Sequence, residues 1–336
     1  MKNTELIISS GLDSEDLEDR ADTGPDVELR RLIFGEAQHA LRLDQALVEL
    51  IPEFSRSYLQ QLIDLDGVTI NGKSIRKPST RVKAADVATI ELRPTPQSQA
   101  FKPEVMALEV AYEDEHLMVI NKPAGLVVHP APGNWSGTLL NGLLAYDPKA
   151  ANLPRAGIVH RLDKDTSGLM VVARSRLVMD ALIRLIAARE VSRQYLALAH
   201  RPWGGARTRE ISAPMGRDPR NRLRMAVVDM TRHPGKLART DVELLQNSDQ
   251  GCLVRCTLHT GRTHQIRVHM ASINHPLVAD ELYGGAIAAG MHRQALHACR
   301  LAFTHPATLV PMVFQAVLPE DLDQALSQWG LRYNSN

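Results

Sequence analysis

Residues 157–173 read GIVHRLDKDTSGLMVVA and form the most unusual stretch of the chain. Apolar runs enter and leave this segment, and between them lies a turn of charged and hydroxyl residues that ends at Gly168. The pattern predicts two strands joined by a polar loop. Catalytic groups are commonly found on loops that a rigid scaffold holds in place. We therefore expect a functional role for this loop and for Asp163 within it.

Strand-like and helical runs alternate along the rest of the second half of the chain. Strands are predicted at 108–112, 117–120, 169–173, 195–199 and 253–258, and helices at 138–145, 177–188 and 263–273. Such mixing predicts an α+β domain over residues 104–325, followed by a C-terminal tail at 326–336.

A separate small module is predicted at residues 39–93. Two short amphipathic helices, the second capped by Ser55, are followed by a strand that runs into the turn Asn71-Gly72 and by a later strand at 87–92. The proline-rich segment 94–103 predicts an interdomain linker. Residues 1–38 have few large apolar side chains and predict an acidic flexible tail.

The two signs of charge are segregated along the chain. Residues 1–28 carry nine acidic and two basic side chains, whereas residues 201–239 carry ten basic and three acidic ones. A basic stretch of this kind indicates contact with phosphate backbones, although a solvated basic loop is the plainer interpretation. With 14 aromatic residues in the chain, shape and backbone contacts are favoured over a platform for stacked single-stranded bases.

Composition excludes several other classes of protein. The chain has 336 residues, 44% of them hydrophobic, and contains neither a membrane-length apolar run nor a secretory leader pattern. Its three cysteines cannot build a disulfide framework, and we expect them to be packed as reduced thiols. The sequence thus predicts a soluble cytoplasmic protein.

Three interpretations of the polar loop compete on the residues alone. Asp163, Asp165 and Ser167 match the first positions of a calcium-binding loop, but position 12 is Arg174 where a bidentate glutamate is needed. A phosphoryl-transfer site with Mg²⁺ requires further carboxylates and a phosphate-cradling glycine loop, and the chain has no GxxxxGK[ST]. Two aspartates that only cap a turn are the ordinary structural explanation.

Other sequence motifs of the chain favour a catalytic explanation of the loop. HRLDKDTSGL at 160–169 resembles the catalytic motif of the RluA family of pseudouridine synthases. GRTHQIRVHM at 261–270 and HPLVADELYGG at 275–285 resemble later motifs of that family, in the expected order, and VINKPAGLVVHP at 119–130 and PRAGIVH at 154–160 extend the likeness upstream. The resemblance covers roughly residues 40 to 320. It implies a central mixed, largely antiparallel sheet flanked by helices and loops.

The resemblance also implies roles for four residues. Asp163 would act at the sugar, as a nucleophile, a base or a stabiliser of positive charge. Arg267 would be the cation that keeps this carboxylate ionised. Arg161 would fill the space left by the extruded base, and Tyr195 would stack on the flipped uracil. The reaction needs no cofactor and no metal.

The small module resembles an S4 RNA-binding domain, through Arg42-Leu-Asp44, Ser55-Arg-Ser57, residues 67–73 and residues 86–90. This likeness implies contacts with structured RNA, because such modules present a local basic patch to it. The candidate contact residues are Arg42, Arg56, Ser57, Lys73 and Lys77.

Three further residues have open assignments. A metal site is one interpretation of His264 and His269. However, a five-residue spacing places them on different faces of a helix. We therefore expect them to make structural hydrogen bonds. For Arg262, contact with RNA phosphate and closure of a loop are equally favoured.

The expected partner is 23S ribosomal RNA, or the large ribosomal subunit or its precursor. Members of the family with this architecture would be expected to modify either the loop of helix 69 or other sites of 23S ribosomal RNA. A different class of function is a noncatalytic RNA-binding factor for ribosome assembly. No membrane and no obligate protein partner are implied, and a monomer is expected.

Overall fold

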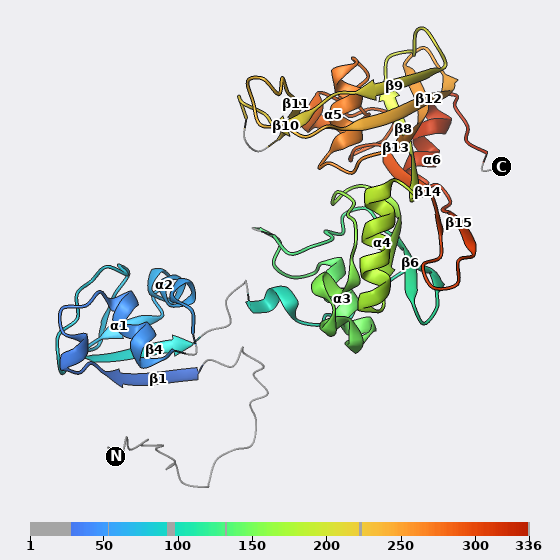
Figure 1. The fold of residues 1–336 in the computed structure, drawn as a ribbon. Helices are drawn as coiled ribbons and strands as arrows, with labels where there is room; N and C mark the ends of the chain where they lie inside the picture. Colours follow the sequence, from blue (N-terminus) through green and yellow to red (C-terminus); the bar gives the residue numbers. More distant parts are fainter. Residues whose placement is uncertain (1–27, 53, 93–97, 132, 222–223, 335–336) are drawn as a thin grey trace, which may run out of the picture. The chain divides into compact units, whose positions relative to one another are not determined.

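The computed structural model describes residues 28–52, 54–92, 98–131, 133–221 and 224–334. The chain divides into two compact units, residues 1–97 and 98–336. We describe each unit by itself (Figure 1).

The first unit contains a four-stranded antiparallel sheet and two helices. The strands occur in the order β1, β4, β2, β3. Its elements are β1 (Glu28–Ile33), α1 (Leu43–Leu50), α2 (Arg56–Asp64), β2 (Val68–Ile70), β3 (Lys73–Ser74) and β4 (Val87–Leu92). Ser55 caps α2 by accepting a hydrogen bond from the Tyr58 amide, as predicted. Leu47 of α1, Leu59 of α2 and Ile90 of β4 belong to one buried core.

The predicted tail ends earlier than expected. Residues 28–33 form β1, which pairs with β4 along its whole length, and Phe34 after it is 1% exposed. The run Leu29-Arg-Arg-Leu-Ile33 does not alternate, so the strand depends on its pairing partner and not on a local pattern. Residues 1–27 lie outside the described residues.

A buried carboxylate joins the two helices of the first unit. Asp44 is fully buried and accepts hydrogen bonds from Arg42, Arg56 and the Gln60 amide. Burial alone would raise the pKa of Asp44, but the bonds from Arg42, Arg56 and Gln60 together lower it well below its ordinary value. This carboxylate therefore stabilises the module in its ionised form.

The second unit is built on a nine-stranded mixed sheet of described residues. The strand order is β5, β6, β7, β14, β8, β13, β12, β9, with β15 also paired to β14. Only the β7–β14 pair is parallel. The strands are β5 (Val110–Glu113), β6 (Leu117–Lys122), β7 (Ser167–Ala173), β8 (Ser192–His200), β9 (Thr208–Ser212), β12 (Arg239–Asn247), β13 (Gly251–Leu258), β14 (Leu296–Thr304) and β15 (Pro311–Gln315). The predicted mixed, largely antiparallel sheet is confirmed.

Helices cover both faces of this sheet, and α3 and α4 lie beside β6 in Figure 1. The helices are α3 (Leu139–Tyr146), α4 (Arg176–Ala188), α5 (Gln265–Ser272) and α6 (Glu320–Gln328), and a short hairpin is formed by β10 (Met215–Arg217) and β11 (Met225–Val227). Tyr195 and Ala197 of β8 share a core with α3 and α5, whereas Leu196 and Leu198 pack with α6. This alternation determines which β8 side chains face the functional loop.

Two predicted boundaries of the catalytic domain are too narrow. Part of the predicted linker, residues 98–101, forms a 3₁₀ turn, and the Asn141 side chain of α3 donates to the carbonyls of Ala100 and Lys102. The predicted C-terminal tail contains Leu331, which is 2% exposed in the core around α6. Both segments belong to the second unit because they complete its buried surface.

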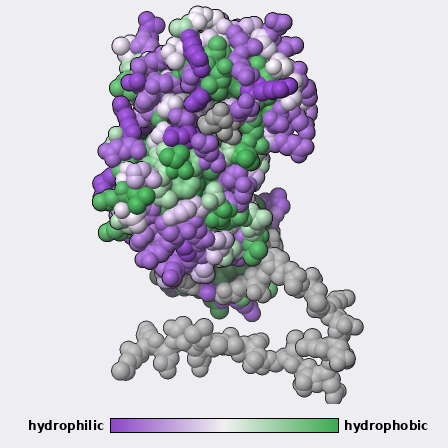
Figure 2. Space-filling model, turned by 90° about the vertical axis from the view of Figure 1, so that its right-hand side faces the viewer, coloured by the Kyte–Doolittle hydropathy of each residue, from purple (hydrophilic) through white to green (hydrophobic). Residues whose placement is uncertain are grey.

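Three features of the described residues bear on what the composition indicates: a mixed surface, helices too short or too polar for a membrane span, and reduced cysteines. Hydrophilic and hydrophobic residues are interspersed on the face shown in Figure 2. None of the helices formed by the described residues has the length and apolar character needed to cross a bilayer. Cys252, Cys256 and Cys299 are buried free thiols, as predicted.

We predict that Asp44→Ala destabilises the first unit by about 2 kcal/mol, because it removes a buried acceptor of charged hydrogen bonds, while Arg42 and Arg56 stay partly exposed to water. Because the folded-state pKa is lowered, the contribution of Asp44 is complete above pH ~4, the unfolded value, and is lost as the pH falls below it. Hydrogen exchange of the α1 and α2 amides in the full chain measures the loss. Glu49→Ala, an exposed change on the same helix, should alter stability by less than ~0.5 kcal/mol.

Candidate active site

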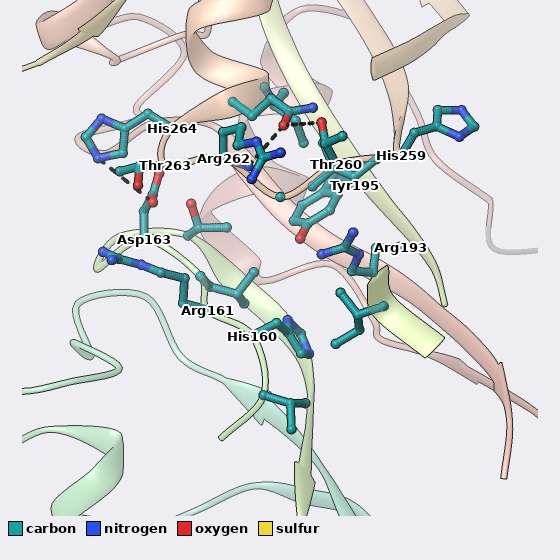
Figure 3. A pocket seen from close by; sticks show the side chains of 18 of the residues that line it. His160, Arg161, Asp163, Arg193, Tyr195, His259, Thr260, Arg262, Thr263 and His264 are labelled. Atoms are coloured by element: carbon teal, nitrogen blue, oxygen red, sulfur yellow. Dashed lines mark hydrogen bonds and ion pairs between the residues drawn. The ribbon is translucent and has the colours of Figure 1, made fainter. Parts of the chain in front are cut away.

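One cavity of ≈ 800 Å³ lies where the loop before β7, the start of β8 and the β13–α5 loop meet (Figure 3). Its described lining contains a single carboxylate, Asp163, and six arginines but no lysine. The arginines are Arg155, Arg161, Arg189, Arg193, Arg262 and Arg267. A volume of this size suits a nucleotide, and the excess of positive charge suits a polyanion.

Asp163 and Arg267 meet in this cavity. The Asp163 side chain is 15% exposed, and its Oδ2 accepts a 3.2 Å hydrogen bond from Arg267 Nη1. Asp280 holds the other edge of the same guanidinium, with Nε and Nη2 each 2.7 Å from its carboxylate oxygens. Burial alone would lower the pKa of Arg267, but Asp280 and then Asp163 raise it above its ordinary value. Asp163 thus always faces a fixed positive charge.

Two basic side chains donate hydrogen bonds to main-chain carbonyls of the polar loop. Lys122 Nζ donates to the carbonyls of Pro123, Leu126 and Lys164, which uses all three of its protons. Arg293 Nη1 donates to the Asp165 carbonyl at 2.9 Å and pairs with Asp321 of α6. These bonds connect the loop to β6 and to the C-terminal part of the unit.

Glycine is required where the loop enters β7. Gly168 has a φ of 114°, and a side chain there would run into the main chain of Ala298 on β14. The neighbouring Ser167 hydroxyl bonds the ring of His297 on the same strand, β14. The close β7–β14 approach therefore determines where Asp163 stands.

Tyr195 projects into the cavity from β8. It is 5% exposed, and burial raises its pKa to about 12, an effect that Arg193 reduces and Asp163 reinforces. The phenol is neutral near pH 7, and Figure 3 shows its ring among the side chains that line the cavity. A ring placed in this way can stack on a base.

Arg161 and Arg262 are exposed and line the cavity rim. Figure 3 shows Arg161 beside Asp163. Arg262 closes the β13–α5 loop: its amide donates to the Gln265 side chain, and its Nε donates to the Leu237 carbonyl at 3.3 Å. The structural role foreseen for Arg262 is present, and its place at the rim keeps contact with RNA open.

The two histidines have different surroundings. His269 is fully buried between the Thr240 hydroxyl and the Ala213 carbonyl, which confirms its predicted structural role. His264 bonds the Tyr283 hydroxyl, but its Nε2 also lies 3.9 Å from Asp163 Oδ1. Burial lowers the pKa of His264, which keeps the ring neutral near pH 7. His264 has a φ of 57° at the start of α5, a conformation that is rare outside glycine and frequent at functional sites.

The predicted contact residues of the first unit fall into two groups. Arg42 and Arg56 are engaged with Asp44, although 40% and 47% of their side chains remain exposed. Ser57, Lys73 and Lys77 are exposed. Their contact with RNA remains a prediction.

Sequence reasoning did not assign Asp280, Lys122 or His264 to the site. Asp280 and Lys122 lie within quoted motifs, but nothing local shows that they bond a residue far along the chain. A usable signal exists for Asp280, because a buried arginine has five N–H donors and one carboxylate cannot bond all of them. For His264, nothing in its motif shows that the ring lies beside the carboxylate of Asp163.

Comparison with known proteins identifies the family. Residues 116–272 match the family model described as RNA pseudouridylate synthase, and residues 41–87 match the S4 domain. Ribosomal large subunit pseudouridine synthase D of Neisseria meningitidis serogroup B is 46% identical over 299 residues, which cover 85% of this chain and 78% of that protein. The chain belongs to the RNA pseudouridylate synthase family. Its likeness to the pseudouridine synthases and the S4 domain is thereby confirmed.

Further relatives agree with this family membership. The Yersinia pestis protein of the same name is 43% identical over 308 residues, covering 87% of this chain and 92% of that protein. The solved structure of human RNA Pseudouridylate Synthase Domain Containing 1 has a TM-score of 0.52 and 26% identity, and covers 66% of this chain and 89% of its own. The chain is therefore an RNA uridine isomerase by family.

We predict that Asp280→Asn lowers kcat by about 100-fold, because a neutral amide no longer fixes the Arg267 guanidinium against Asp163. RNA affinity should change little, since Asp280 does not line the cavity. Single-turnover rates and binding titrations separate these two quantities. Glu281→Gln, an exposed neighbour, is the matched control. Equal losses in affinity and rate would mean that Asp280 acts elsewhere.

Proposed function

We propose that this protein converts uridine to pseudouridine in the 23S ribosomal RNA of the large subunit, within the loop of helix 69. The single observation that carries the proposal is the Asp163–Arg267 pair in a nucleotide-sized, arginine-lined cavity. The names of the relatives, which specify the large ribosomal subunit, support the substrate class. We further propose that it acts as a monomer in the cytoplasm, where this RNA is found.

The reaction breaks the bond between N1 of uracil and C1′ of ribose and forms a bond between C5 and C1′. The C5 proton leaves, and N1 gains a proton. Asp163 serves the sugar step, either by bonding to the sugar carbon or by taking a sugar proton. Arg267 keeps its charge throughout because Asp280 remains bonded to it.

The base must leave the helical stack before Asp163 can reach its sugar. Arg161, exposed beside Asp163, occupies the vacated space, and Tyr195 stacks on the extruded uracil. In the first unit, Ser57, Lys73 and Lys77, with the exposed parts of Arg42 and Arg56, contact structured RNA. These contacts orient the substrate and carry no chemistry.

We predict that Asp163→Asn abolishes pseudouridine formation in a 23S ribosomal RNA fragment, with a loss of about a thousandfold or more. Binding of the fragment should persist because the amide keeps the shape of the carboxylate. Asp165→Asn is the matched control, since Asp165 shares the loop but does not line the cavity. Full turnover by Asp163→Asn would overturn the assignment. A noncatalytic assembly factor predicts no pseudouridine even from the unaltered chain.

Two further measurements address the alternatives. Activity that survives EDTA is expected here, whereas metal-dependent phosphoryl transfer predicts its loss. Mapping pseudouridines in ribosomal RNA from cells that lack the gene tests the site. Loss confined to the helix 69 loop is the expected result, and loss at other 23S positions would assign the chain to the other branch of the family.

A further inference from the structure

Arg193 is a mostly buried cation that has no partner among the described residues. Its side chain projects from β8 into the cavity, on the same face as Tyr195, and the residue is 6% exposed. Among the described residues no side-chain hydrogen bond or ion pair involves it, and its Nε is buried and unbonded. Two other buried cations of this unit differ: Arg267 pairs with two carboxylates, and Lys122 donates to three carbonyls.

A guanidinium in this position destabilises the free protein. A buried charge without a counter-ion costs folding free energy, and buried polar groups are nearly always bonded. The one carboxylate in the described lining, Asp163, is bonded to Arg267. An anion that enters the cavity can therefore supply the partner that Arg193 lacks among the described residues.

The β13–α5 loop lies against the Arg193 guanidinium. A Cβ built at Gly261 would stand 2.9 Å from Arg193 Nη1, which shows how near the loop main chain comes to the cation. The planar fork, which is weakly hydrated and can present two parallel donors, matches a phosphate.

We propose that Arg193 binds a phosphodiester of the RNA strand that carries the extruded uridine. This inference rests on the proposed function, which places RNA in the cavity with the base at Tyr195 and the sugar at Asp163. With the base at Tyr195 and the sugar at Asp163, the charged part of the nucleotide still to be held is a phosphate. The other lining arginines apart from Arg267 are exposed at the rim, so Arg193 is the deep anchor of the backbone.

The test uses the full chain with Asp163→Asn, which prevents turnover, and a 23S ribosomal RNA fragment. Adding Arg193→Gln should weaken binding about 10- to 100-fold at low salt. It should also reduce the slope of log K against log salt by ~0.7, the value for one single-strand phosphate contact. Arg176→Gln, which removes an exposed arginine of α4 that does not line the cavity, should change neither quantity.

A second arm identifies the group on the RNA. Uncharged methylphosphonates replace the phosphodiesters around the target uridine one at a time. One position should weaken binding to the Arg193 protein and have no further effect on the Arg193→Gln protein. An unchanged salt slope, or no such position, overturns the proposal and indicates a uracil carbonyl as the ligand.

A third arm excludes a purely structural role. Arg193→Met should leave Tm at or above that of the unaltered protein, because it removes an unpaired buried charge. A lower Tm together with an unchanged salt slope would show that Arg193 only packs against the β13–α5 loop. Neither binding nor Tm depends on turnover, so failure of the proposed function, seen as no pseudouridine from the unaltered chain, is a separate result.

Discussion

The site depends on one guanidinium shared between two carboxylates. Arg267 bonds Asp163 at one edge and Asp280 at the other, and Asp163 and Arg267 are 104 residues apart in the chain. If Asp163 were the only partner, any step that neutralised Asp163 would leave a buried cation unpaired. Asp280 removes that penalty, since it stays bonded while Asp163 changes charge. Asp163 can therefore lie in the cavity without being the only counter-ion of Arg267.

The position of Asp163 is set by contacts far from it in sequence. The single parallel strand pair, β7 with β14, places the end of the polar loop against residues 297 and 298, and only glycine at 168 permits that approach. Lys122 and Arg293 then bond successive carbonyls of the loop, at residues 164 and 165. The loop has no regular structure of its own, yet its main chain is held on several sides. This arrangement gives a loop the precision that catalysis requires.

Local sequence information was sufficient to predict helices that have a regular apolar period or a capping residue at the N-terminus. The helix predicted at 177–188 is α4, and Ser55 caps α2 as expected. The fold brings together Asp163, Arg161, Tyr195 and Arg267, which the motifs had grouped, in one cavity, and their roles stay predictions. The failures share a cause, because β1, the burial of Leu331 and the role of Asp280 depend on partners distant in sequence. Residues 28–33 lack alternation and form a strand only because β4 supplies the other half of the ladder.

The use of arginine in the cavity follows from what burial does to the two basic side chains. Burial lowers the pKa of Lys122 to about 8, even with Asp165 nearby and three carbonyls bonded. A lysine at the depth of Arg193, without those acceptors, would lose its charge more readily still. A guanidinium remains charged when it is desolvated, so it is already positive when the substrate brings an anion into the cavity. Arg193 and Arg267, the two buried arginines of the described lining, can therefore keep their charge at a depth where a lysine would lose it.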